Sequence, residues 1–343
     1  MAFGAKKPTT LMDVANKAGV SVSTVSKVLK NSEQFKPDTV KIVREAAREL
    51  NYNPNILARG VVMGGHTPVI SFFVPNIMDP FFAEFVDHVE RYLRAEDYLL
   101  TLCLFNEDPQ IMSGYLKFLM QIRAAGVIFG PCRVDECLED IRTAQEFMSM
   151  VSIQSDIPGI SRVDITGEQG SFEIVEYLIR NGHKKIGFVG YGYHMSVMRA
   201  RLIGYKRALE HNGIPIREEY IAEGQHSYDS CYQLTQKMLQ LPDRPTAIQC
   251  PTEYIARAVY KAIYDMGLKI PEDISVVGFD NISIATTLYP PLTTMSQPLD
   301  DMARIAVDKI IKLIKNEQTR EENPETIILE HEFIIRDSVK SLV

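Results

Sequence analysis

Hydroxyl and ammonium groups gather on one face of a short segment near the N-terminus. Ser23, Lys27 and Lys30 are spaced by three or four residues, so they share one side of a helix. Such groups donate hydrogen bonds to base edges and phosphates, and this face therefore predicts contact with a nucleic acid. An ordinary helical hairpin without a DNA role has the same spacing, and the spacing alone leaves both interpretations open.

Two short helices and a glycine turn must position that face. Thr10 can cap a first helix, Gly19 tolerates the left-handed backbone that ends it, and Ser21 can cap a second helix. Apolar residues at helical spacing supply the packed side of both helices: Leu11, Val14, Ala15, Ala18, Val25, Val28 and Leu29. This is the geometry of a helix-turn-helix, whose second helix enters the major groove.

The stretch TLMDVANKAGVSVSTVSKVL at residues 10–29 closely resembles the head of the lactose-repressor (LacI/GalR) family of transcriptional regulators. The resemblance continues into most of the chain. It passes through LNYNPN at residues 50–55, which follows a third expected helix with inward-facing Val40, Val43, Ala47 and Leu50.

The resemblance implies an α/β fold with three parts. A three-helix DNA-binding domain is expected at residues 9–55, a hinge helix at 56–66, and an effector-binding and dimerisation domain at 67–343. That last domain is expected to be a two-lobe body like a periplasmic binding protein, with parallel sheets. We place its N-lobe at about 67–165 and 293–322, and its C-lobe at about 166–292 and 323–343.

The same resemblance assigns DNA contacts in the head. Val22, Ser23 and Lys27 are expected to face base edges, where Val22 can meet a thymine methyl group and Lys27 can donate to guanine. A lysine exposed only to solvent is the alternative for Lys27. Phosphate contacts, which fix register without selecting sequence, are expected from Thr10, Ser21, Thr24 and Asn55.

The hinge departs from the family pattern. Relatives insert a leucine into the minor groove, and the matching position in NILARGVV (residues 55–62) is Val61, after Gly60. Valine and glycine both weaken this short helix, and the smaller valine wedge should open the base step less completely, so we expect a shallower DNA kink. Leu57 and Ala58 are expected to lie beside Val61 in the groove, and Leu57 or Val62 is the alternative wedge.

Charge is distributed unevenly along the 343 residues. The whole chain has a formal net charge of −7, but residues 1–66 hold ten Lys or Arg against five Asp or Glu. Only the N-terminal part is basic, which agrees with DNA binding by the head alone.

From Val69 onward, short apolar runs alternate with amphipathic stretches, a pattern that predicts parallel βαβ units. Strands are predicted at 69–74, 99–105, 126–129, 150–153, 185–189, 247–250 and 275–279, with helices that include 81–95, 167–181, 198–212 and 253–266. Ligands of such sheets collect beyond the carboxyl ends of the strands. The loop PNIMDPFF at residues 75–82 thereby offers Asp79, Phe81 and Phe82, whose alternative roles are helix capping and core packing.

Two further motifs resemble the family's effector site. RLIGY (201–205) and VGFDN (277–281) imply that Arg201 and Asp280 bind the effector, and a guanidinium with a carboxylate suits a polyhydroxylated ligand. A purely structural ion pair between them is the alternative. Thr252, His226 and Gln297 are also expected in the cleft, although PTE at 251–253 and Gln154-Ser155 depart from the family pattern and leave the ligand unidentified.

An enzyme and a solute receptor fit this sequence less well than a regulator does. A cleft with Asp79, Arg201, Glu253 and Asp280 can in principle hold a catalytic acid and base, but the sequence contains no nucleophile elbow or phosphate loop, and we expect no enzyme. A solute receptor has a similar body, but that role calls for a signal peptide, whose apolar stretch is missing from residues 1–8, and the predicted DNA-binding head also argues against it.

The sequence therefore predicts a cytoplasmic homodimer on a palindromic operator in double-stranded DNA, regulated by a small molecule, with a sugar preferred and a purine or other co-repressor as the alternative. No leucine-heptad tail follows Val339, so a dimer without a tetramerisation helix is expected. Five cysteines without Cys-x-x-Cys spacing predict buried thiols, and no metal, cofactor or membrane contact is expected.

Overall fold

The computed structural model describes residues 9–30, 34–52, 65–192 and 195–343. They form two compact units, a head within residues 1–67 and a body of residues 68–343. Each unit has its own hydrophobic core. No helix in the described ranges is long and apolar enough to cross a membrane.

Three helices make the head: α1 (Leu11–Ala18), α2 (Val22–Lys30) and α3 (Pro37–Glu49). Their buried residues are Val14, Ala15, Val25, Val28, Val43, Ala46 and Ala47, which agrees with the predicted apolar faces. Gly19 ends α1 with φ 67°, the left-handed conformation that only glycine adopts without strain.

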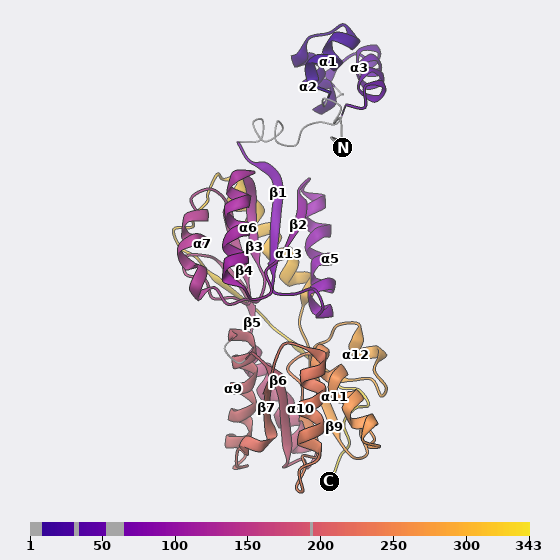
Figure 1. Cartoon of the computed structure of the whole chain (residues 1–343), viewed down its shortest axis with the longest axis vertical. Coiled ribbons are helices and arrows are strands. Elements are labelled where there is room, and N and C mark those ends of the chain that lie inside the picture. Colours follow the sequence, from indigo (N-terminus) through magenta and orange to yellow (C-terminus); the bar gives the residue numbers. More distant parts are fainter. Residues whose placement is uncertain (1–8, 31–33, 53–64, 193–194) are drawn as a thin grey trace, which may run out of the picture. The chain divides into compact units, whose positions relative to one another are not determined.

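The N-lobe of the body is a parallel sheet in the order β11-β5-β4-β3-β1-β2. Its strands are β1 (Thr67–Val74), β2 (Leu99–Leu104), β3 (Ala124–Phe129), β4 (Ser149–Ile153), β5 (Arg162–Ile165) and β11 (Thr326–Leu329). Its helices are α5 (Pro80–Ala95), α6 (Pro109–Gln121), α7 (Leu138–Ala144) and α13 (Leu299–Lys315), with a 3₁₀ turn at Asp135–Cys137. Although α13 comes late in the chain, it lies with the N-lobe strands, in light orange in Figure 1.

The C-lobe sheet has the order β12-β10-β9-β8-β6-β7, with only β12 antiparallel to its neighbour. Its strands are β6 (Ile186–Tyr191), β7 (Ile221–Gly224), β8 (Ala247–Gln249), β9 (Ser275–Asp280), β10 (Thr293–Ser296) and β12 (Glu332–Ile334). Its helices are α8 (Gly167–Arg180), α9 (Ser196–His211), α10 (Tyr228–Leu239), α11 (Glu253–Asp265) and α12 (Ile284–Thr287), with a 3₁₀ turn at Glu218–Tyr220.

The chain crosses between the lobes at places that differ from the expected lobe boundaries. Strand β10 pairs with β9 and so belongs to the C-lobe, although residues 293–322 were assigned to the N-lobe. Strand β11 pairs with β5 in the N-lobe, although residues 323–343 were assigned to the C-lobe. Periodicity cannot tell which of two sheets receives a strand of four residues, because that choice is made by tertiary pairing.

Polar caps fix where the helices at the cleft begin. Asp79 accepts a hydrogen bond from the backbone N–H of Phe81 at 3.0 Å, and Pro80 occupies the first helical position of α5. Thr252 caps α11 in the same way, accepting from Ile255 N–H at 3.3 Å. These caps aim the loops that follow β1 and β8 at the space between the lobes.

Helices α8 and α9 pack so closely that one position excludes any side chain. A Cβ at Gly204 of α9 would lie inside contact distance of the Glu168 backbone oxygen and 2.8 Å from the Cβ of Ser171. Because α9 also carries Arg201, this close packing helps to fix the cleft side chain.

We predict that Gly204→Ala lowers the free energy of unfolding by about 2–3 kcal/mol, because α8 and α9 must move apart. Gly114→Ala on α6 is the matched control, since a Cβ there meets nothing within 4 Å. It should raise stability by about 0.5–1 kcal/mol through helix propensity. Urea unfolding of the two variants would contradict this packing if both shifted in the same direction.

Candidate nucleic-acid interface and candidate ligand cleft

The N-terminal half of the head is built around two hydroxyl caps. Thr10 and Asp13 form a reciprocal capping box, in which the Asp13 backbone N–H donates to Thr10 Oγ1 at 3.3 Å and the Thr10 backbone N–H donates to Asp13 Oδ2 at 2.8 Å. Ser21 Oγ accepts from Thr24 N–H at 3.1 Å and lies 2.8 Å from Thr24 Oγ1. The predicted phosphate-contacting hydroxyls therefore also start the two helices, and their positions follow from helix geometry.

Helix α2 presents the three predicted base-contacting residues to solvent. Val22 is 38% exposed, and Ser23 and Lys27 are exposed as well, while Val25 and Val28 are buried in the head core. Ser23 Oγ lies 2.9 Å from Ser21 Oγ, so hydroxyls cluster where α2 begins. The start of a helix favours anions, so this cluster suits a phosphate.

Four predicted DNA-contacting residues cannot be placed. Asn55, Leu57, Ala58 and Val61 lie outside the described residues, as does most of the predicted hinge at 56–66.

All eight predicted effector residues line one cleft between the lobes of the body, hereafter the cleft. They are Asp79, Phe81 and Phe82 from the N-lobe, and Arg201, His226, Thr252, Asp280 and Gln297 from the C-lobe and its crossover. The cavity enclosed there is only about 30 Å³, whereas ligand pockets usually measure roughly 300–1,000 Å³. The lobes are therefore closed on a nearly filled space, and a sugar-sized ligand requires them to separate.

The floor of the cleft is a buried ion pair. Arg201 Nη2 lies 3.1 Å from Asp280 Oδ1, and both side chains are only 2% exposed. Arg201 also donates to the Pro251 backbone oxygen and stacks on Phe279, with Cζ 3.8 Å from the ring centroid. Burial raises the pKa of Asp280 to about 7, although the Arg201 guanidinium lowers it.

Two glutamines extend this pair across the lobe boundary. Gln297 Nε2 donates to Asp280 Oδ1 at 2.5 Å, and its own Oε1 accepts from Gln154 Nε2 at 2.9 Å. Gln154 was recognised in the sequence only as a departure from the family pattern. Its backbone has φ 55°, an uncommon conformation for a residue other than glycine, which brings this side chain into the cleft from the end of β4.

An acid and an aromatic stack form the remaining polar features of the cleft. Asp79 is buried, and desolvation raises the pKa of its carboxyl group. His226 stacks on Tyr191 with ring centroids 3.9 Å apart, and its Nε2 has no hydrogen-bond partner among the described residues. Further lining residues that the sequence did not identify are Pro75, Pro131, Tyr191, Met195, Val197 and Met198. They are apolar or aromatic, so nothing distinguishes them from core positions in the sequence.

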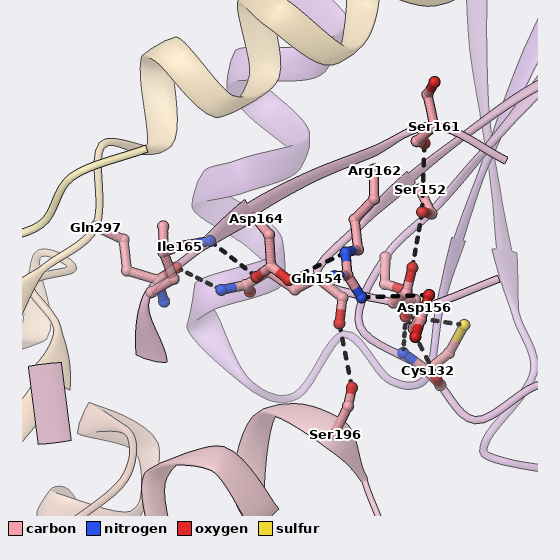
Figure 2. A network of polar contacts seen from close by, with 12 residues as sticks. Cys132, Ser152, Gln154, Asp156, Ser161, Arg162, Asp164, Ile165, Ser196 and Gln297 are labelled. Carbon is pink, nitrogen blue, oxygen red and sulfur yellow. Dashed lines mark hydrogen bonds and ion pairs between the residues drawn. The ribbon is translucent and has the colours of Figure 1, made fainter. Parts of the chain in front are cut away.

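A second, more polar compartment adjoins the cleft at Gln154. Figure 2 shows Arg162 between Asp164 and Asp156, at N–O distances of 3.2 and 3.5 Å, and Ser196 donating to the Gln154 backbone oxygen at 3.3 Å. The cavity there is about 140 Å³. Because the two carboxylates neutralise Arg162, this compartment offers no unpaired cation to an anionic ligand.

Polar contacts hold the two lobes together at the rim of the cleft. Glu84 of α5 accepts from the Ser283 N–H at 2.9 Å, and Glu107 lies 3.6 Å from His226 Nδ1. A ligand that separates the lobes must break these contacts and the Gln154–Gln297 hydrogen bond.

Comparison with known proteins identifies both parts of the chain. Residues 10–55 match the family described as bacterial regulatory proteins, lacI family, and residues 175–339 match a periplasmic binding protein-like domain. Catabolite control protein A of Priestia megaterium is 32% identical over 333 residues, covering 96% of this chain and 99% of the relative. The transcriptional repressor PurR of Photobacterium profundum is 32% identical over 339 residues, covering 97% and 99%.

Among solved structures, the lac repressor dimer bound to operator and the anti-inducer ONPF is similar to this chain. The TM-score is 0.82 at 25% identity, with 97% of this chain and all of that chain covered. The α/β fold with a helical head and a two-lobe body is therefore the one that the sequence predicted.

We predict that Arg201→Met lowers the free energy of unfolding by about 3–5 kcal/mol, because it leaves Asp280 buried without its cation. Arg207→Met on the same helix, which removes an exposed pair with Glu168, should cost no more than about 1 kcal/mol. Adding Asp280→Asn to Arg201→Met should restore part of the loss. Equal urea midpoints for the two single variants would show that the buried pair does not hold the cleft.

Proposed function

Because the chain belongs to the lacI family of bacterial regulatory proteins, we propose that it is a sequence-specific DNA-binding repressor whose operator affinity is changed by a small molecule in the cleft. The observation that carries this proposal is the exposed face of α2, with Val22, Ser23 and Lys27 outward over a packed core. A protein that acts on DNA in this way works in the cytoplasm and needs no catalytic chemistry.

In the head, one set of residues contacts the bases and another contacts the phosphates. Lys27 and Ser23 supply donors to base edges, and Val22 supplies an apolar contact for a thymine methyl group. Thr10, Ser21 and Thr24 supply hydroxyls for phosphates, and Ser21 and Thr24 are already held together at the start of α2. Asn55 would add a further phosphate contact, and the hinge residues Leu57, Ala58 and Val61 would enter the minor groove.

The proposed DNA-bound form is a homodimer on a palindromic operator. One head reads a single half-site, so two copies related by a two-fold axis gain affinity and specificity on a symmetric site. The lac repressor structure similar to this chain is itself a dimer on an operator.

The charges of the cleft favour a neutral, hydroxyl-rich effector such as a sugar. The guanidinium of Arg201 is already engaged by Asp280, Pro251 and Phe279, so it has little left for an anion. Asp79 and Asp280 would repel a phosphate or carboxylate, whereas sugar hydroxyls can donate to both acids. The ring faces of Phe81, Phe82 and His226 provide apolar surface for a sugar ring.

A purine or other co-repressor is the second candidate effector. The relative PurR is a transcriptional repressor, which agrees with a ligand that strengthens operator binding. The stacked rings of Tyr191 and His226 offer a flat surface for a base. The two candidates predict opposite signs: a sugar inducer weakens operator binding, and a co-repressor strengthens it. We favour induction.

We predict that Lys27→Met raises the operator dissociation constant by roughly 5- to 150-fold, corresponding to about 1–3 kcal/mol for one base contact. The operator is first recovered from genomic fragments by gel shift. Lys41→Met, an exposed lysine of α3, is the control and should change affinity by less than about threefold. Equal loss of affinity for operator and random DNA would remove Lys27 from sequence reading.

We predict that neutral sugars raise the melting temperature of the full chain and that the phosphates of the same sugars do not. The panel pairs D-ribose with ribose 5-phosphate, and glucose and cellobiose with their phosphates. Asp79→Asn keeps the helix cap but removes the charge, and should weaken the best neutral sugar by roughly tenfold or more. A larger shift from a phosphate than from its parent sugar would contradict a neutral-effector cleft.

A further inference from the structure

Glu253 is a buried acid that lies behind the floor of the cleft. It is the first residue of α11, directly after the Thr252 cap, and its side chain is fully buried. It does not line the cleft, so direct effector contact does not account for it. Burying a carboxylate is costly unless a cation or several donors compensate it.

The Glu253 carboxyl group holds the turn that carries Asp280. Its Oε1 accepts from the backbone N–H of Asn281 at 2.9 Å and from Thr294 Oγ1 at 2.5 Å. Asp280 and Asn281 both have positive φ, 119° and 59°, which is strained for residues with a Cβ. Such a conformation persists only where neighbours impose it. Here the backbone N–H of Gln297 donates to the Asp280 backbone oxygen at 3.1 Å, and Glu253 accepts from the backbone N–H of Asn281.

The charges around Glu253 leave it without a cation of its own. No described residue forms a hydrogen bond with Oε2, and none forms an ion pair with the Glu253 carboxyl group. The ionisable groups that interact electrostatically with Glu253 are Asp280 and Cys250, and neither is a cation. Asp280 faces Arg201, Asp79 and Gln297, while Arg336 donates to the side chain of Asn281 at 2.7 Å. One guanidinium, that of Arg201, thus serves Asp280 and not Glu253.

We propose that Glu253 is a positioning residue that acts as an uncharged acid and holds the Asp280–Asn281 turn in the form that pairs Asp280 with Arg201. Burial and the neighbouring Asp280 both raise the pKa of Glu253 well above its ordinary value, in agreement with this assignment. An ionised Glu253 would place an unpaired carboxylate beside the carboxyl group of Asp280. Any effect of Glu253 on effector affinity rests on the proposed function, whereas the positioning of the turn does not.

The pH dependence has a definite sign. When the pKa of a carboxyl group is higher in the folded than in the unfolded state, the group costs no stability at pH values below its unfolded pKa, because it is protonated in both states. Stability is then lost as pH rises toward the folded pKa, because the folded state resists ionisation. Glu253→Gln keeps an acceptor at the Oε1 position and cannot ionise, so it should escape this loss.

The experiment compares the full chain with Glu253→Gln, Glu253→Leu and Thr294→Val, and uses Glu272→Gln as a control for the loss of an exposed carboxylate. Melting temperatures are measured from about pH 5.5 to 8.5, together with amide hydrogen exchange of residues 278–284. The advantage of Glu253→Gln over the parent should grow with pH, whereas that of Glu272→Gln should stay constant. Exchange in 278–284 should stay within about twofold for Glu253→Gln and rise about tenfold for Glu253→Leu.

Thr294→Val keeps the test decisive if Glu253→Leu does not fold. It removes one donor to the same oxygen and should speed exchange of 278–284 by about two- to fivefold, with exchange of 186–191 unchanged. A stability difference between Glu253→Gln and the parent that stays constant from about pH 5.5 to 8.5 would show that Glu253 is already ionised in the folded state and overturn the proposal. Unchanged exchange in the folded leucine or valine variants would equally overturn it. None of these measurements uses DNA or a sugar, so their failure is distinct from failure of the proposed function.

Discussion

The buried ion pair between Arg201 and Asp280 is the interaction on which the cleft depends. Two charges removed from water are tolerated only when their geometry is fixed and their remaining donors and acceptors are satisfied. The stack on Phe279 and the bond to Pro251 fix the guanidinium, and Gln297 and the strained turn fix the carboxylate. The close packing of α8 and α9, the helix caps and the lobe crossovers all bring these groups to one point.

The same arrangement suggests how a small molecule acts on the lobes. In the closed body, Gln154, Gln297, Glu84 and Glu107 already use their polar groups on the opposite lobe. A ligand shifts the balance between closed and open bodies only by binding one of them more tightly. An effector whose hydroxyl groups replace these contacts would bind the open body more tightly and so shift the balance toward it. In a dimer, any change in the spacing of the two heads would follow from that shift.

Sequence reasoning identified both the head and the cleft, for different reasons. The head was predictable because its caps, its glycine turn and its apolar spacing are local. Asp79, Arg201 and Asp280 were found through strand ends and motif resemblance, and the structure brings them together. The hydrogen bond of Gln154 to Gln297 and those of Glu253 to Asn281 and Thr294 were not predicted, because they join residues that only tertiary packing brings together. The predicted lobe boundaries were wrong at β10 and β11 for the same reason. The local sequence of a short strand does not determine which strand it pairs with.

Reciprocal linkage between the cleft and the operator tests the central claim most directly. The measurement is fluorescence anisotropy of an operator fragment at increasing concentrations of the best-binding sugar, with sugar affinity measured by calorimetry with and without operator. Linkage requires that each ligand change the affinity for the other by the same factor. The account predicts weakening in both directions by at least about fivefold. A sugar that binds the cleft and leaves operator affinity unchanged, or strengthens it, would contradict the account.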